Sequence, residues 1–305
     1  PMNTELGRTI DDLPDVFNAA EDLLMPNVES RPEKAAIIDY RGMVTYRDLY
    51  DRVTRMTDVF ARLGVTRDQR VLLCLTDTRD FPTVFLGAIR AGVIPVPLNT
   101  LLTPDDFGWI LCNSGAVAVF VSGDLADKWT DIAANQPYVR FISSDGGPWA
   151  DLEALIEGAN PMTEPADTHR DDVAFWLYTS GSTGRPKGAM HAQSSMRLTA
   201  NLYAMGTLGL RENDKVLSIA KQFFAYGLGN SLTFPYAVGA TVVLFNGRAT
   251  PEAISEVIVE NDISVLCGVP TFFAGWFAHP SCPTAEQPPS LRIATSAGEA
   301  LPAHV

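Results

Sequence analysis

Residues 178–188 read Tyr-Thr-Ser-Gly-Ser-Thr-Gly-Arg-Pro-Lys-Gly, and an apolar run typical of a buried strand, 173–178, leads into them. Glycines let a backbone turn its N–H groups toward an anion, and hydroxyl and cationic side chains add donors for phosphate oxygens. A Ser/Gly-rich loop in general is more often a solvated turn. The ordered composition directly after a buried strand favours a phosphate-binding loop here.

Two common phosphate-binding motifs do not fit this stretch. The P-loop of kinases and GTPases requires a Gly-Lys pair followed by Ser or Thr, whereas Lys187 follows Pro186 and precedes Gly188. No Gly-x-Gly-x-x-Gly opens a helix after the first apolar strand, so a dinucleotide-binding fold has no support. The loop therefore belongs to another class of nucleotide site.

The segments around this loop alternate between helical and strand patterns. Helices are predicted at 46–63, where Thr45 and Asp48 form a capping box, and at 81–91, 104–113, 194–206 and 251–260. Strands are predicted at 71–75, 93–97, 117–121, 173–178, 216–219, 241–245, 263–266 and 291–295. The alternation predicts an α/β fold with right-handed crossovers.

A polar, proline-containing segment at 158–172 (GANPMTEPADTHRDD) interrupts this alternation. We interpret it as a surface connection between a first α/β part, approximately 1–170, and a second part, 171–305. At the other end, the strand at 291–295 runs into SAGE, and Leu301-Pro302 predicts the first turn of a helix. A natural domain seldom ends one turn into an element, so we expect the chain to be truncated at Val305.

Composition limits the classes of partner. The 305 residues include 36 acidic and 23 basic side chains, for a net charge of -13. Such a chain is a poor ligand for nucleic acid or an anionic membrane, and an anionic substrate needs a local cationic or amide-lined site. The N-terminus lacks a signal-peptide pattern, and the apolar stretch at 265–278 is too short to span a bilayer. Four cysteines without paired spacing predict free thiols in a cytoplasmic protein, and four scattered histidines predict no metal cluster.

The stretch 178–188 matches the phosphate-loop signature of the adenylate-forming, or AMP-binding, enzymes. These include acyl- and aryl-CoA ligases, luciferases and peptide-synthetase adenylation domains. The chain is most similar to benzoate-CoA and 4-hydroxybenzoate-CoA ligases, as judged from FWLY at 175–178, AMH at 189–191, KQFFAYGLGN at 221–230, TFP at 233–235, VGAT at 238–241, GVPT at 268–271 and SAGEALP at 296–302. The resemblance covers essentially the whole chain. It implies the large N-terminal domain of this family, built of layered α/β subdomains, with a small C-terminal lid domain missing after Val305.

The resemblance also implies a two-step ligase. A carboxylate attacks the α-phosphorus of Mg-ATP to give an acyl-adenylate and pyrophosphate, and the thiol of coenzyme A then displaces AMP. A free carboxylate is a poor electrophile, whereas the adenylate carries a good leaving group whose charge the loop can hold. The implied substrates are an aromatic acid (benzoate or hydroxybenzoate), ATP and coenzyme A, with Mg2+. The family's catalytic lysine is expected beyond Val305, so this fragment should hold no catalytic residue and show little ligase activity.

By the same resemblance, two segments contact the nucleotide. The loop is expected to bind the β- and γ-phosphates through Thr179, Ser180, Ser182, Thr183 and Lys187, with Gly181 and Gly184 shaping it. Thr179 is also the expected Mg2+ ligand. The turn after the last strand resembles the adenine-binding turn of the family, which implies nucleotide contacts by Gly298, Glu299 and Ala300. The alternative is an ordinary surface turn.

The aromatic segment that follows the loop is expected to form the acid pocket. The resemblance implies that Phe224 is an aromatic gate between carboxylate and thiol channels, and that the acyl site is lined by Ala225, Tyr226, Gly227 and Ala297. A small residue leaves room for a flat arene, and aromatic faces can stack on it. The alternative is that the aromatic residues are ordinary core. Peptide-synthetase domains carry an aspartate in this region, whereas 222–228 contains no acid, which disfavours an α-amino acid.

Other interpretations stay open from the sequence. Within the superfamily, the alternative is a ligase for a heteroaromatic or fatty acid. From a different class, the alternative is a nucleotide-binding fragment without catalysis. His191 lies close to the loop, where a general base could act, but a lone histidine there is more often structural. The sequence also leaves open whether the protein forms a homodimer.

Overall fold

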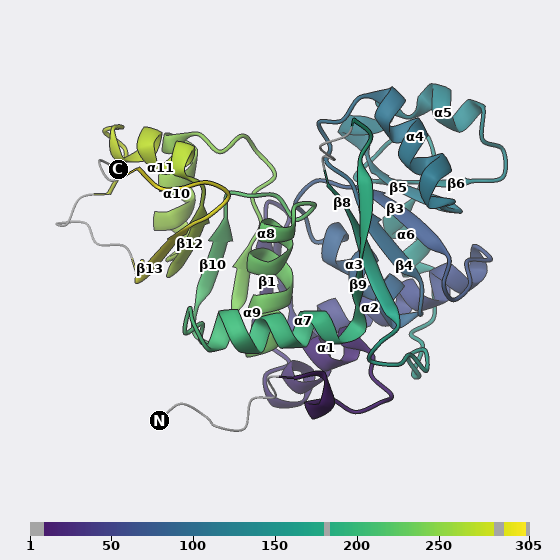
Figure 1. The fold of residues 1–305 in the computed structure, drawn as a ribbon, viewed down its shortest axis with the longest axis horizontal. Coiled ribbons are helices and arrows are strands. Elements are labelled where there is room, and N and C mark those ends of the chain that lie inside the picture. Colours follow the sequence, from purple (N-terminus) through teal and green to yellow (C-terminus); the bar gives the residue numbers. More distant parts are fainter. Residues whose placement is uncertain (1–8, 180–183, 284–289, 303–305) are drawn as a thin grey trace.

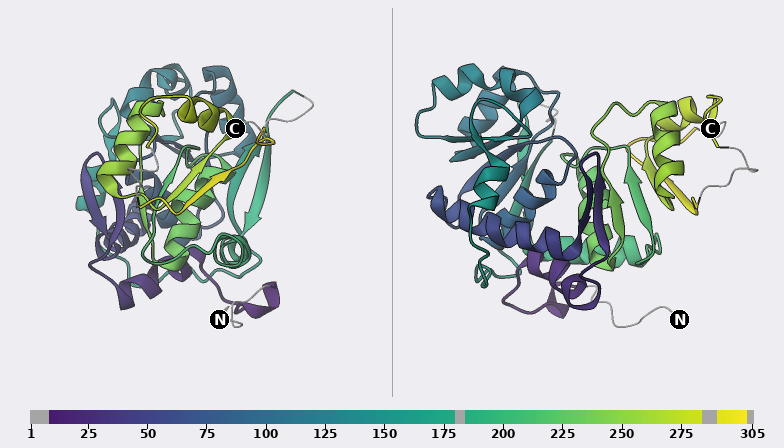
Figure 2. Two further views of the ribbon diagram at one scale, coloured as in Figure 1. Left: turned by 90° about the vertical axis from the view of Figure 1, so that its left-hand side faces the viewer. Right: turned by 180° about the vertical axis from the view of Figure 1, so that it is seen from behind.

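The computed structural model describes residues 9–179, 184–283 and 290–302. These residues form two α/β lobes that lie side by side, each around its own sheet (Figure 1). The same two lobes are visible from behind (Figure 2). The α/β class predicted from the alternation of helices and strands is therefore confirmed.

The first lobe contains a parallel sheet. Within the described residues its strands lie in the order β4-β3-β5-β6-β7, which are Ile94–Pro97, Arg70–Cys74, Ala118–Ser122, Arg140–Ser144 and Ala150–Asp151. Each neighbouring pair is parallel. Strand β5 is buried along its whole length, as expected of a central strand whose two faces are both covered.

The second lobe contains a mixed sheet. In the described part of the chain its order is β13-β12-β10-β11-β1-β2, which are Ile293–Ser296, Val265–Gly268, Lys215–Ser218, Thr241–Val243, Ala35–Asp39 and Gly42–Thr45. The pairs are parallel except for β1 and β2, which form an antiparallel hairpin. This hairpin comes from the N-terminal part of the sequence and lies beside β11. The sheet of the second lobe therefore takes two strands from before residue 170.

Strands β8 (Val173–Thr179) and β9 (Lys187–Ala192) form a separate antiparallel ribbon, and β8 packs along β4. The strand predicted at 173–178 is present as β8, but its antiparallel pairing was not predicted. Strand β9 was not predicted, because its residues are exposed or half-buried and lack an apolar alternation.

Helices cover both sheets. Their bounds are α1 Ala19–Ser30, α2 Tyr46–Arg62, α3 Asp80–Arg90, α4 Pro104–Ser114, α5 Thr130–Ala134, α6 Leu152–Glu157, α7 Gln193–Thr199, α8 Ala225–Leu228, α9 Phe234–Val238, α10 Pro251–Asn261 and α11 Pro270–Phe277. Short 3-10 segments lie at Ile10–Asp12 and Gly123–Lys128, and π-helical segments at Ala200–Met205 (η3) and Gly229–Thr233 (η4). The predicted capping box of α2 is confirmed, because Thr45 Oγ1 accepts from the Asp48 N–H and the Asp48 carboxylate accepts from the Thr45 N–H, each at 3.1 Å.

Two predicted helical segments differ from the structure. The helix at 194–206 ends as α-helix at Thr199 and continues as π-helical η3, a change of hydrogen-bond register that apolar spacing does not encode. Leu301 and Pro302 are not helical. A first helical turn depends on hydrogen bonds from the residues that follow it, and 303–305 lie outside the described residues.

The connection at 158–172 is held along the first lobe by backbone hydrogen bonds. Met162 N–H donates to Thr54 O at 3.3 Å, and Ala166 N–H donates to Arg90 O at 2.8 Å. Phe17 N–H donates to Thr168 O at 2.8 Å, which ties the N-terminal segment to the same connection. The segment predicted as a surface connection is therefore hydrogen-bonded to the first lobe and to the N-terminal segment.

The largest cluster of buried apolar side chains links the first lobe to the segments that carry the predicted site. It extends from helices α2 and α3 to Phe175 and Leu177 of β8 and to Phe223 and Leu228 of the aromatic segment. Each fully buried Leu or Phe stabilises the fold by about 1.5–3 kcal/mol. We call the paired strands β8 and β9, which flank the predicted phosphate loop, the phosphate hairpin, and residues 221–230 the aromatic segment. Both pack on this one core.

All four cysteines are free, as predicted. In the described ranges, no helix combines the length and apolar character needed to cross a membrane.

Candidate functional site

The predicted phosphate loop connects two paired strands. The register places Thr179 opposite Lys187 and Tyr178 opposite Gly188. Residues directly opposite in an antiparallel pair have Cβ atoms about 4.5–5.5 Å apart on one face. The first and last polar side chains assigned to phosphate binding are therefore neighbours. Four residues predicted to bind phosphate or to shape the loop lie outside the described residues: Ser180, Gly181, Ser182 and Thr183.

Helix α4 anchors both sides of this hairpin. Tyr178 OH donates to Asn113 Oδ1 at 2.6 Å. On the other side, Arg185 pairs with Asp105 at 3.2 Å, and its guanidinium lies 5.8 Å from the centre of the Trp109 ring. Asp105 therefore offsets the charge of Arg185, whereas Lys187 is exposed and forms no ion pair with any described residue. Lys187 is the cation of this hairpin that is available to an incoming anion.

Gly184 has a φ of 109°, and a Cβ there would have no neighbour within 4 Å. The backbone conformation, rather than crowding, is what favours glycine at this position.

A first cavity, which we call the hairpin cavity, brings the phosphate hairpin and the aromatic segment together. It has a volume of about 170 Å³ and is lined by Pro97, Leu98, Asn99, Leu102, Tyr178, Thr179, Pro186, Phe223 and Phe224. Phe224 precedes α8, and its side chain is 45% exposed. Its ring centre lies 4.6 Å from that of buried Phe223. The residue predicted to be an aromatic gate thus shares one cavity with Thr179.

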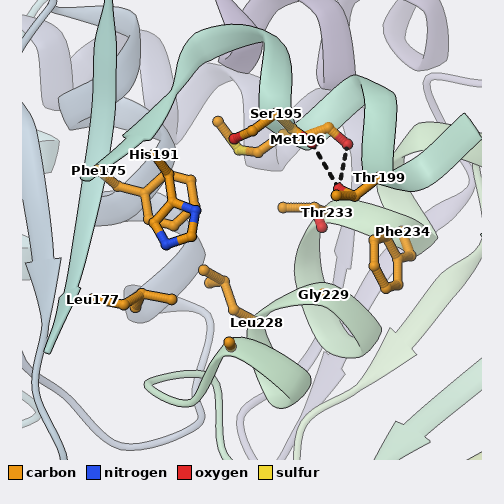
Figure 3. A pocket seen from close by; sticks show the side chains of 11 residues that line it. Phe175, Leu177, His191, Ser195, Met196, Thr199, Leu228, Gly229, Thr233 and Phe234 are labelled. Carbon is orange, nitrogen blue, oxygen red and sulfur yellow. Dashed lines mark hydrogen bonds between the residues drawn. The ribbon is translucent and has the colours of Figure 1, made fainter. Parts of the chain in front are cut away.

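A second cavity, which we call the ring cavity, lies between β8, β9, α7, α8 and η4 (Figure 3). Its volume is about 160 Å³, and its lining residues are Phe175, Leu177, His191, Ser195, Met196, Thr199, Ala225, Leu228, Gly229, Thr233 and Phe234. No carboxylate or ammonium group is among these lining residues. Of the residues predicted to line the acyl site, Ala225 lies here.

His191 is held flat in the wall of the ring cavity. Its ring stacks on Phe175 with centres 4.5 Å apart and an interplanar angle of 1°. Burial lowers the pKa of His191, which favours a neutral imidazole with one donor and one acceptor nitrogen. Ser195 and Thr199 in the same wall already donate to backbone carbonyls, to Ala192 O and Ser195 O, both at 2.7 Å.

The other predicted acyl-site residues lie away from these two cavities. Tyr226 OH is 2.8 Å from Thr295 Oγ1 of β13, and burial raises the pKa of Tyr226. Gly227 is buried against the backbone of 220–221. Ala297 N–H donates to Gly268 O at 3.3 Å. The Tyr226–Thr295 contact links α8 to the strand that leads into the predicted adenine-binding turn.

That turn follows β13, which is the edge strand of the sheet in the second lobe (Figure 1). Gly298 has a φ of 97°, and Glu299 and Ala300 are exposed. None of the three lines the hairpin cavity or the ring cavity. Their contact with a nucleotide stays a prediction.

One buried group behind the aromatic segment, Asp77, was not predicted from the sequence. Asp77 is 3% exposed, and its Oδ1 accepts from the Gln222 N–H at 3.1 Å. Burial raises the pKa of Asp77 to about 6, and the charge of Lys221 opposes that rise. The available signal was its position just after the predicted strand at 71–75, because the carboxyl ends of parallel strands are where α/β folds place functional residues.

The family of AMP-binding enzymes matches residues 25–305. The benzoate–CoA ligase of Thauera aromatica is 45% identical over 96% of this chain and 56% of its own length. The 4-hydroxybenzoate–CoA/benzoate–CoA ligase of Rhodopseudomonas palustris is 42% identical over 95% of this chain and 54% of its own length. The chain thus spans about half the length of these curated relatives.

Solved structures agree with the fold. A benzoate CoA ligase from Burkholderia xenovorans LB400 superposes with a TM-score of 0.88 at 44% identity, covering 94% of this chain and 57% of that one. An anthranilate CoA ligase in complex with anthranoyl-AMP gives a TM-score of 0.92 at 32% identity, covering 96% and 57%. The resemblance drawn from the phosphate loop is confirmed, as is the fold class of the N-terminal part of adenylate-forming enzymes. This chain belongs to the AMP-binding enzyme family.

Proposed function

We propose that the complete protein activates an aromatic carboxylate, benzoate or a hydroxybenzoate, to an acyl-adenylate and then to its coenzyme A thioester. The ring cavity carries this proposal. Its volume of about 160 Å³ and its mostly apolar lining suit one aromatic ring, since an apolar cavity of about 150 Å³ binds benzene. The names of the relatives from Thauera aromatica and Rhodopseudomonas palustris support the same substrate class.

In the proposed reaction, a carboxylate oxygen attacks the α-phosphorus of ATP and the bond to pyrophosphate breaks. The sulfur of coenzyme A then attacks the acyl carbon, its proton is lost, and AMP leaves. Thr179 and Lys187 hold the departing phosphates, because they are opposite one another on the hairpin and offer a hydroxyl and an uncompensated cation. Phe224 separates the acid from the thiol path. The lysine that assists the first step in this family is proposed to lie outside this chain.

Both parts of the chain contribute to the proposed site. Residues 171–305, the second part, supply the phosphate hairpin, α8 and the turn at 297–300. The first part, 1–170, supplies the wall of the hairpin cavity at Pro97, Leu98, Asn99 and Leu102. We propose that the site takes residues from both of these parts of the chain.

Mg2+ fits the hairpin as an ion that ATP carries with it. In the described ranges, no group of three or more His, Cys, Asp or Glu side chains is placed to hold a metal. Mg2+ is commonly bound through phosphate oxygens, waters and one or two protein oxygens, so a dedicated cage is not required. We propose that the Thr179 hydroxyl supplies a protein oxygen. The bound ion would neutralise phosphate charge.

The substrate class is tested with a panel of acids on the complete protein. Benzoate and the hydroxybenzoates should give the highest kcat/KM for pyrophosphate release and for thioester formation. Nicotinate, hexanoate and phenylalanine should be poorer substrates, because they are more polar, more flexible or charged at the amino group. A preference for hexanoate or phenylalanine would refute the aromatic assignment, and nucleotide binding without turnover of any acid would refute the ligase.

Filling the ring cavity should impair use of the acid. Ala225→Leu adds three carbon atoms to the space that the acid would occupy, and a steric conflict of about 1–3 kcal/mol corresponds to about 5- to 150-fold in kcat/KM for benzoate. The KM for ATP should change little. Met190→Leu is a suitable control, because Met190 lies on the same hairpin with 66% of its surface exposed. Equal kinetics for Ala225→Leu and Met190→Leu would place the acid elsewhere.

A further inference from the structure

The segment between β10 and α8 crosses the junction of the two lobes. On one side, the Gln222 N–H donates to Asp77 Oδ1 at 3.1 Å, and Asp77 follows β3 of the first lobe. On the other side, Lys221 Nζ donates to Phe245 O and, at 3.3 Å, to Gly247 O. These two carbonyls follow β11 of the second lobe. Residues 221–222 are therefore held from both sheets at once.

The side chains of Lys221 and Gln222 are enclosed by the rest of the protein. Gln222 is fully buried, and its Nε2 donates to Ser231 O at 3.0 Å. Lys221 is largely enclosed, and burial lowers its pKa while Asp77 opposes this. Charged groups in such surroundings cost stability unless they are paired and hydrogen-bonded. The arrangement therefore places two ionisable groups, each of which favours the charged form of the other, behind the aromatic segment.

The position of 221–222 is transmitted to the predicted site through short contacts. Phe224 N–H donates to Lys221 O at 3.0 Å. Gly227 packs so closely on the same carbonyl that a Cβ would lie 2.0 Å from it. Phe224 lines the hairpin cavity, and Ala225 lines the ring cavity. A shift of Lys221 and Gln222 would therefore move the walls of both cavities.

We propose that Asp77 and Lys221 are positioning residues for the aromatic acid. Asp77 fixes the backbone at Gln222 against the first lobe, Lys221 fixes the same backbone against the second lobe, and together they place Phe224 and Ala225 relative to the phosphate hairpin. This inference rests on the proposed function. The ATP site should respond less than the acid site, because Thr179 on β8 and Lys187 on β9 belong to a hairpin that has further anchors on α4.

The first test compares two substitutions of Asp77 in the complete protein. Asp77→Ala removes the acceptor for the Gln222 N–H and should raise the KM for benzoate by about 5- to 30-fold, the equivalent of one lost hydrogen bond. The KM for ATP should stay within about twofold. Asp77→Asn retains an acceptor oxygen of the same shape and should recover most of the lost affinity for the acid. Equal rises in both KM values, or no recovery with asparagine, would overturn the inference.

A second variant keeps the test decisive if Asp77→Ala does not fold. Asp77→Asn combined with Lys221→Met removes both charges together, so neither charge is left buried without the other. This double variant should unfold near the wild-type temperature yet show a raised KM for benzoate, because methionine cannot donate to Phe245 O and Gly247 O. A wild-type KM for benzoate in this variant would overturn the inference.

A matched control removes an ion pair far from the site. Glu33 and Arg47 are exposed and pair at 2.6 Å, so Glu33→Gln with Arg47→Met should leave both KM values unchanged. The wild-type protein separates the two proposals. If it activates no aromatic acid, the proposed function fails; if it does so and the variants show no selective change in the KM for the acid, only the positioning role fails.

Discussion

Lys187→Ala in the complete protein is expected to lower kcat/KM for ATP by about 10²–10³-fold, the usual effect of removing one donor that stabilises charge developing in a transition state. Lys187 lies at the start of β9, opposite Thr179, is exposed and has no ionic partner among the described residues. Its charge is therefore available to the phosphates of ATP. The effect is read from initial rates of pyrophosphate release at varied ATP, with saturating benzoate.

Arg185→Ala is the matched control for this prediction. Arg185 lies two residues before Lys187, but it pairs with Asp105 and stacks over Trp109. An exposed pair of this kind contributes about 0–1 kcal/mol, so its loss should lower kcat/KM for ATP by less than about tenfold. Wild-type kinetics in Lys187→Ala, or a larger loss in Arg185→Ala, would contradict the assignment of Lys187 to phosphate binding.

Gly227→Ala is expected to destabilise the protein strongly. A Cβ at this position would lie 2.0 Å from Lys221 O and 2.4 Å from Ala220 O. Both are backbone atoms, so relief requires the segment at 220–222 to move. Overpacking of this kind costs about 3 kcal/mol or more, which should lower Tm by roughly 5 °C or more in thermal unfolding followed by circular dichroism.

Gly108→Ala provides the comparison. Gly108 lies inside α4, and a Cβ there would have no neighbour within 4 Å. Alanine in a helix interior is favoured over glycine by about 0.5–1 kcal/mol, so this variant should unfold at or above the wild-type temperature. A Tm for Gly227→Ala at the level of Gly108→Ala would mean that the backbone around Lys221 yields easily, which would also weaken its proposed positioning role.

Local chemistry made much of the fold predictable. The capping box of Thr45 and Asp48 marks the start of α2, and a continuous apolar run marks β5, because both depend on nearby residues. Strand β9 gave no such signal, since its side chains are largely exposed. The antiparallel pairing of β8 was hidden for the same reason, because it depends on a partner without an apolar pattern.

The residues of the candidate site also fall into those that local sequence predicts and those that depend on the tertiary fold. The phosphate hairpin was identifiable because its composition is local and specific. The meeting of Thr179 with Phe224 in one cavity requires the tertiary fold, although the resemblance led to both residues. Asp77 carried little signal, because its partner Gln222 is far away in the sequence. Functional contacts between distant segments are set by packing, which single-sequence patterns do not describe.

The N-terminal hairpin has a consequence for how the protein is made. Ile37 of β1 pairs with Val242 of β11. The hairpin of β1 and β2 is therefore synthesised well before the strand that pairs with its other edge. At about 5–20 residues per second, that delay is roughly 10–40 s. During this time one edge of β1 offers unpaired backbone groups, which can capture other chains. Slow emergence of the second lobe therefore exposes the nascent chain to aggregation, and chaperone binding to the first fifty residues would shield it.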